Sequence, residues 1–160
     1  MSTGLRTSTL ALVLVLCSAT PAQGAPTAVG KFDRTTWAQW KDTLPRPSVV
    51  VFTTTDCEFC PATIDALARA VRKKGRAKAN LVVVVMDGAG KDGSLLADAH
   101  YRRADALYAF DGQEMALRYS INPAWRGITP YVALLPGRGE IGFFTGRPSA
   151  AALEALLRAR

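Results

Sequence analysis

The sequence predicts an α/β domain with a central mixed sheet and helices on both faces. Two runs rich in β-branched and apolar residues, at residues 48–53 and 80–86, flank a long amphipathic helical pattern. Such a strand–helix–strand crossover implies parallel pairing, and strands that are apolar throughout are typical of a sheet covered on both faces. A third apolar run at 131–135 is followed by a Pro-Gly turn, which predicts an antiparallel hairpin at the end of the sheet.

The composition excludes several classes of protein. The chain has 160 residues, of which 49% are hydrophobic and 21% charged, with a formal net charge of +7. These values suit one globular domain plus a removable segment, and they exclude a disordered chain or a fibrous repeat. Three cysteines are too few for a small scaffold stapled by disulfides. No apolar stretch reaches the roughly 18 residues of a transmembrane helix, so a membrane transporter is excluded.

The first two dozen residues have the pattern of a secretory signal peptide. Arg6 supplies a positive charge, Leu10–Cys17 is a short apolar segment, and Ala22–Gly24 offers a cleavage pattern before Ala25. We therefore expect a periplasmic protein, cleaved near Ala25 and without stable membrane insertion afterwards. An uncleaved anchor or a buried N-terminal strand is the alternative. The expected segments are a signal peptide over 1–24, a linker over 25–33 and the folded domain over 34–160.

The basic residues are not expected to bind nucleic acid. Six of them lie between residues 69 and 78, at the predicted end of a helix, where cations interact favourably with the helix dipole. An exported protein rarely meets nucleic acid, and clustered cations alone are a weak electrostatic signature.

The first half of the domain alternates helix and strand. Arg34–Leu44 predicts a short helix that Pro45 and Pro47 end, and the strand over 48–53 follows it. The next helix has one apolar face, which consists of Cys60, Ile64, Leu67, Ala68 and Val71.

The second half begins with the strand over 80–86 and a glycine-rich loop. We expect a helical insert there, with helices over Leu95–Ala106 and Gln113–Tyr119. Tyr131–Leu135 then pairs with Glu140–Thr145. Ser149 is placed to cap a last helix, whose inward residues are Leu153, Leu156 and Leu157.

Cys57 and Cys60 carry the chemistry of the predicted domain, and they are the two cysteines left after removal of residues 1–24. Cys57 lies at the mouth of the helix, where unpaired amides and the dipole favour a thiolate. Cys60 belongs to the buried face. Two intervening residues bring the sulfurs within bridging distance, so one thiolate can attack a partner's disulfide and the other cysteine can resolve the product. The pattern predicts thiol–disulfide exchange without a metal or an organic cofactor.

Three other functions for the cysteine pair stay open. A zinc site needs about four ligands, and the cysteine pair together with the lone His100 does not supply them. A structural disulfide that closes four residues gains little loop entropy. A copper-binding delivery protein would use the same two sulfurs, with Met86 and Met115 as further candidate ligands.

Residues 35–160 resemble the thioredoxin superfamily, and within it the exported TlpA-like redoxins. The matching segments are Val49–Thr53, Cys57–Cys60, Tyr119–Ile121, Arg126–Tyr131, Gly137–Ile141 and Gly146. The resemblance implies a thiol–disulfide oxidoreductase in which Cys57 is the nucleophile and Cys60 the resolving thiol. It also implies protein thiols or disulfides as partners, together with an electron-donor protein. Pro130 is then expected to be cis, to face the cysteines and, with Thr129, to present backbone to a substrate.

The chain departs from the family pattern in three places. Asp56 stands where the family usually has tryptophan, and Phe59 stands where it usually has proline. Many thioredoxins carry a buried carboxylate six residues before the first cysteine, and Val51 stands at that position here. Proton transfer by a buried acid at this position is therefore not expected.

The residues expected to tune the redox equilibrium are Asp56, Glu58, Phe59, Trp125 and Arg126. Asp56 and Glu58 flank Cys57 with negative charge, and like charge disfavours a thiolate. Arg126 would offset one carboxylate if it approached the sulfur, and Trp125 would cover the sulfurs. A less stable thiolate makes the disulfide less oxidising. We therefore expect a reductant rather than a strong oxidant.

Overall fold

The computed structural model describes residues 24–73 and 79–159. The expected signal peptide lies outside these residues apart from Gly24, so cleavage and export stay predictions. The strands are β1 (Val29–Phe32), β2 (Ser48–Thr53), β3 (Asn80–Val85), β4 (Ala106–Phe110), β5 (Tyr131–Leu135) and β6 (Gly142–Thr145). The helices are α1 (Arg34–Thr43), α2 (Cys60–Val71), α3 (Asp92–Ala97), the short 3₁₀-helix η1 (Tyr101–Arg103), α4 (Glu114–Ile121) and α5 (Ala150–Arg158).

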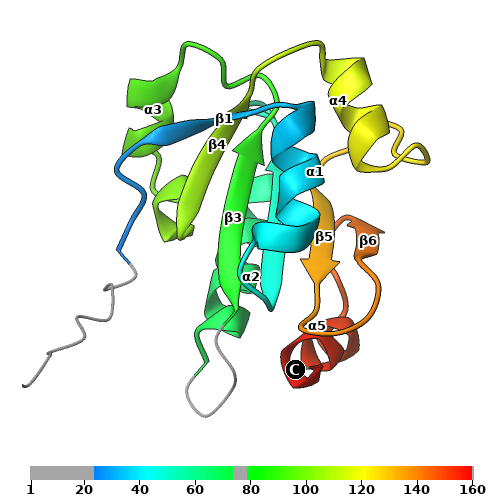
Figure 1. The fold of residues 1–160 in the computed structure, drawn as a ribbon. Coiled ribbons are helices and arrows are strands. Elements are labelled where there is room, and N and C mark those ends of the chain that lie inside the picture. The colour runs from blue at the N-terminus through cyan, green and yellow to red at the C-terminus, as the bar shows by residue number, and fades with distance from the viewer. Residues whose placement is uncertain (1–23, 74–78, 160) are drawn as a thin grey trace, which may run out of the picture.

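The six strands form one mixed sheet in the order β1-β4-β3-β2-β5-β6. The first four strands of that order are parallel to one another, whereas β5 is antiparallel to both β2 and β6. Figure 1 shows the consequence: the carboxyl ends of β2, β3 and β4 and the amino end of β5 lie at the same, upper edge of the sheet. The mixed sheet predicted from the sequence is confirmed.

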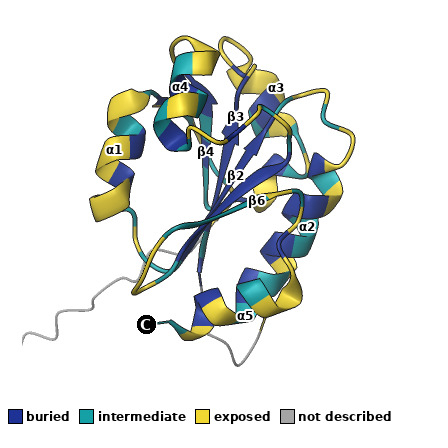
Figure 2. Ribbon diagram, turned by 90° about the vertical axis from the view of Figure 1, so that its right-hand side faces the viewer, coloured by how far each residue is buried: buried dark blue, intermediate teal, exposed yellow. Residues whose placement is uncertain are grey.

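Helices cover both faces of the sheet, and each face has its own apolar core. One core lies between the sheet and α2, α3 and α5, and the other lies between the sheet and α1 and α4. Figure 2 shows α1 and α4 on one side of the strands and α2 and α5 on the other. Every residue of β2 is buried because the strand is central and covered on both faces. This explains why its sequence is apolar without alternation.

The helix predicted over Leu95–Ala106 is wrong. The chain forms α3, then η1, and then the strand β4, which pairs with β3 and β1. Asp98 explains the break, because its carboxylate accepts hydrogen bonds from the backbone amides of His100 (2.8 Å) and Tyr101 (3.0 Å). An aspartate that bonds nearby backbone amides offers them an alternative to a continuous helix.

The linker predicted over 25–33 is wrong from Val29 to Phe32, which form the edge strand β1. Phe32 is fully buried, and its ring stacks on Phe110 of β4 at a centroid distance of 5.4 Å. The next residue, Asp33, caps α1 by accepting a hydrogen bond from the backbone amide of Thr36 at 2.7 Å. A four-residue strand whose partner lies far along the chain has too little local pattern to be recognised.

Candidate active site

Two successive turns carry Cys57 from the end of β2 to the start of α2. The backbone amide of Cys57 donates to the carbonyl of Thr54, and the amide of Cys60 donates to the carbonyl of Cys57, both at 3.3 Å. Cys57 and Cys60 form a disulfide with a Cα–Cα distance of 5.4 Å. The two-residue spacing thus brings the sulfurs together, as the sequence predicts.

The two cysteines differ in exposure. Cys60 is the first residue of α2 and is only 1% exposed, whereas Cys57 is partly exposed. Around Cys57 the chain is open: Asp56 and Glu58 are exposed, and Phe59 is 69% exposed. An attacking thiolate must reach a partner's disulfide, so this difference favours Cys57 as the attacking sulfur.

Pro130 lies at the same edge of the sheet as the cysteine loop. The Thr129–Pro130 peptide bond is cis, as the family resemblance implies. Phe52 is paired with Tyr131 in the antiparallel register of β2 and β5. Pro130 therefore precedes β5 where β2 ends, and its carbonyl accepts a hydrogen bond from the amide of Gly146 at 2.7 Å.

Trp125 is buried in the loop that leads to Pro130. Its indole is 6% exposed, lies 5.2 Å from the ring of Phe52, and donates a hydrogen bond to the carbonyl of Ile128 at 3.0 Å. These contacts account for a packing role. The expected role of Trp125 as a cover over the sulfurs stays a prediction.

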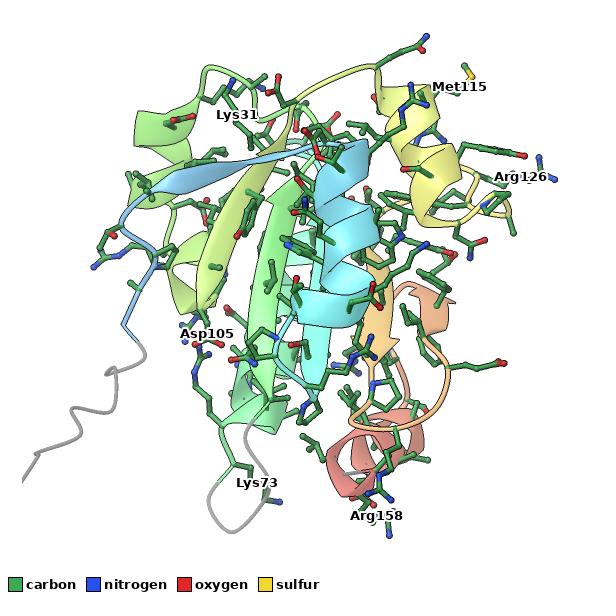
Figure 3. The ribbon with its side chains drawn as sticks, viewed as in Figure 1. Lys31, Lys73, Asp105, Met115, Arg126 and Arg158 are labelled. Atoms are coloured by element: carbon green, nitrogen blue, oxygen red, sulfur yellow. A yellow bond between two sulfur atoms is a disulfide. The ribbon has the colours of Figure 1, made fainter. Side chains whose placement is uncertain are left out.

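Arg126 is exposed, and in Figure 3 its side chain points away from the body of the molecule. Among residues 24–73 and 79–159 it makes no ion pair. Its expected role in offsetting a carboxylate beside Cys57 therefore stays a prediction.

Arg118 packs against the backbone of the loop that leads to Pro130, a contact that the sequence did not predict. Its side chain is only 19% exposed, and its Nε lies 3.1 Å from a carboxylate oxygen of Glu114 in α4. A Cβ added to Gly127 would lie 2.5 Å from a terminal nitrogen of Arg118, so the guanidinium packs directly on the loop backbone. The four-residue spacing of Glu114 and Arg118 was the available signal, because such pairs meet on one helix face.

The residues considered for metal binding are spread over the fold. Met86 is buried in the core under α1 and α4, and Met115 lies 68% exposed on α4 (Figure 3). The Nδ1 atom of His100 lies 3.1 Å from Asp65, whose carboxylate also pairs with Arg103. Within the described ranges, no three histidine, cysteine or acidic side chains lie close enough to hold one metal ion.

The sequence matches no protein-family model and no curated protein. The solved structures similar to this one include the following two. A secreted Mycobacterium tuberculosis disulfide oxidoreductase homologous to E. coli DsbE is 17% identical, with a TM-score of 0.49 over 71% of this chain and 81% of the other. A thioredoxin-related protein from Neisseria meningitidis serogroup B is also 17% identical, with a TM-score of 0.52 over 82% of this chain and 96% of the other. The fold is thioredoxin-like.

The thioredoxin-like fold confirms the fold class predicted from the sequence. It places the Cys57–Cys60 disulfide at the start of α2 and the cis peptide bond of Pro130 at the start of β5. No helix within the described residues is long and apolar enough to cross a membrane.

Proposed function

We propose that this protein is an exported, periplasmic thiol–disulfide oxidoreductase that acts on protein substrates through Cys57 and Cys60, as a reductant rather than a strong oxidant. The observation that carries the proposal is the Cys57–Cys60 disulfide at the start of α2, with one cysteine partly exposed and the other buried. A pair with this asymmetry suits exchange, because one sulfur can meet a partner while the other stays protected inside.

The exchange proceeds in two steps from the reduced dithiol. The Cys57 thiolate attacks one sulfur of a substrate disulfide, forms a mixed disulfide and displaces the other substrate sulfur as a thiolate. Cys60 loses its proton and attacks the Cys57 sulfur, which releases the second substrate thiolate and closes the Cys57–Cys60 disulfide. Two electrons pass to the substrate, and its two sulfurs take up two protons. An electron-donor protein then reduces the disulfide again.

The cis bond before Pro130 supports a role for Thr129 and Pro130 in substrate binding. Within the described part of the chain, the backbone of Thr129 forms no hydrogen bond with another protein group, and Thr129 is partly exposed. An extended substrate segment can therefore pair with this backbone, because an unpaired strand edge is a template for another strand.

The reductant role rests on the charges around Cys57. Asp56 and Glu58 flank it and are exposed, and negative charge beside a sulfur disfavours the thiolate. Stabilisation of the disulfide relative to the thiolate gives a more reducing pair. Such a pair needs an electron source, because the periplasm is oxidising.

Reduction of insulin disulfides by the purified protein, with dithiothreitol as electron source, tests the proposal. We expect a rate well above that of dithiothreitol alone, loss of that excess in Cys57→Ser, and accumulation of mixed disulfides in Cys60→Ala. Asp42→Asn, an exposed residue of α1 that the mature protein keeps, is the control and should retain the full rate. No excess rate in the unmodified protein would refute the oxidoreductase. Inactivity combined with tight, stoichiometric binding of Cu(I) under anaerobic conditions would establish a copper-delivery protein instead.

A further inference from the structure

Asp87 lies just after β3 and forms hydrogen bonds with the loop between β2 and Cys57. Asp87 follows the end of β3 by two residues, and one of its carboxylate oxygens accepts a hydrogen bond from the backbone amide of Thr55 at 2.8 Å. The other oxygen accepts a hydrogen bond from the Thr55 hydroxyl. Thr55 thus gives both of its donors to one carboxylate.

Lys91 completes this cluster. Its Nζ lies 2.9 Å from the carboxylate of Asp87 and donates to the hydroxyl oxygen of Thr55 at 3.3 Å. Burial raises the pKa of Asp87, but the hydrogen bonds from Thr55 and Lys91 outweigh it and hold that pKa below its usual value. Asp87 is therefore ionised at neutral pH, and each of its partners bonds to a charged acceptor, which gives stronger hydrogen bonds than a neutral one.

Thr55 belongs to the first of the two turns between β2 and α2. That turn runs from Thr54 to Cys57 and is closed by the bond from the Cys57 amide to the Thr54 carbonyl. This bond leaves the amide of Thr55 without a partner inside the turn, and Asp87 supplies one. The bond from the Met86 amide to the Thr53 carbonyl, at 2.8 Å, extends the β2–β3 pairing up to this point. These two bonds fix the position of the turn relative to β3.

We propose that Asp87 is a positioning residue for the dithiol: through Thr55 it holds Cys57 at the distance from Cys60 at which the disulfide closes. The inference deepens the proposed exchange function and rests on it. Two thiols held in place react with each other at a high effective concentration. A looser turn lowers that concentration, and the equilibrium constant for closing the Cys57–Cys60 disulfide falls with it.

The equilibrium of the cysteine pair with reduced and oxidised glutathione measures this effect. We expect Asp87→Ala to lower the equilibrium constant for disulfide formation at least threefold. Asp87→Asn keeps a carbonyl oxygen for the Thr55 amide but loses the acceptor of the Thr55 hydroxyl and Lys91, so its effect should be smaller than that of Asp87→Ala. Asp111→Ala is the matched control: Asp111 also follows a strand and pairs with a lysine, Lys31, at 3.1 Å. It should stay within twofold of the unmodified protein.

An equilibrium constant for Asp87→Ala within twofold of the unmodified protein would overturn the inference. An effect of Asp87→Asn as large as that of Asp87→Ala would overturn it too, since the bond to the Thr55 amide would then contribute nothing to the position of Cys57. If circular dichroism shows that Asp87→Ala does not fold, Thr55→Val replaces it, because valine lacks the hydroxyl that binds Asp87 and Lys91. A fall of more than twofold in the equilibrium constant for disulfide formation would then support the inference, and a smaller change would overturn it. Failure of the proposed function is a separate result, seen when the unmodified protein does not reduce insulin.

Discussion

The indole ring of Trp125 stacks on the phenol ring of Tyr131, with ring centroids 4.4 Å apart and planes only 6° from parallel. Trp125 belongs to the loop before Pro130, and Tyr131 is the first residue of β5. The Tyr131 hydroxyl also accepts a hydrogen bond from the side-chain amide of Asn122 at 2.7 Å, at the other end of the same loop. The loop that carries the cis bond is therefore anchored at both ends on one tyrosine.

Replacement of Trp125 by alanine should destabilise the fold strongly. The side chain is 6% exposed and contacts two aromatic rings, and truncation of a buried tryptophan costs about 3–5 kcal/mol. Trp125→Phe keeps part of the stacking and should lose less than half of that. Urea denaturation followed by circular dichroism measures both. A loss below about 1 kcal/mol for the alanine variant would contradict the anchoring role.

The parts of the fold that could be predicted from the sequence have strong local signals. The buried strand β2 and the apolar face of α2 depend on residues close together in the chain. The strands β1 and β4 were missed because each needs its partner: Val29 pairs with Leu107 and Val83 also pairs with Leu107. No local pattern reports such a pairing.

The candidate site divides in the same way. Cys57, Cys60 and the cis bond of Pro130 were predicted because they belong to short motifs and to a family resemblance. Asp87 and Arg118 contact the loops of the site through hydrogen bonds and packing across separate elements. Their partners, Thr55 and Gly127, are fixed by sheet register and loop path, so these contacts could be found only in the structure.

Reduced Cys57 should react with iodoacetamide at least tenfold faster than reduced Cys60. Cys57 is partly exposed between exposed neighbours, whereas Cys60 is 1% exposed at the start of α2, and alkylation requires an accessible thiolate. Mass spectrometry of peptides after timed alkylation measures the two rates, and alkylation after denaturation in urea is the control that should abolish the difference. Equal rates in the folded protein, or faster reaction of Cys60, would refute the assignment of the attacking sulfur.

Asp33 should make the stability of α1 depend on pH in the acid range. Hydrogen bonds from Thr35 and Thr36 lower the pKa of Asp33 from 3.8 to about 2. A carboxylate with a depressed pKa stabilises the fold fully above its unfolded value and loses that contribution as pH falls through its folded value. The Tm of Asp33→Ala should therefore lie below that of the unmodified protein at pH 5, and the difference should shrink between pH 4 and pH 2. Asp42→Ala, on the exposed side of the same helix, is the control. A difference that stays constant over this range would contradict the cap assignment.

Gly127→Ala should cost more stability than Gly139→Ala. Both glycines have positive φ angles, +84° and +97°, so both substitutions force an alanine into a left-handed conformation at a cost of about 1–2 kcal/mol. Only at Gly127 does the new Cβ meet the guanidinium of Arg118, whereas nothing lies within 4 Å of it at Gly139. The difference between the two unfolding free energies isolates the contact with Arg118. Equal losses would show that Arg118 moves aside freely and does not support the Pro130 loop.

The acidic residues beside Cys57 should hold the dithiol on the reducing side. Asp56 and Glu58 are exposed, so each acts on the sulfur through solvent, where a unit charge at about 4 Å is worth on the order of 1 kcal/mol or less. Removal of both charges in Asp56→Asn/Glu58→Gln should stabilise the Cys57 thiolate and lower the equilibrium constant for disulfide formation roughly threefold to tenfold. The effect should fade in 1 M salt, because exposed charges are screened. Asp92→Asn, an exposed acid in the first turn of α3, is the control and should leave the constant unchanged. Equilibration with glutathione buffers gives all three constants. A potential of the unmodified protein near the ~−120 mV of a strong periplasmic oxidant would contradict the reductant role, since two flanking carboxylates would then fail to outweigh the helix amides.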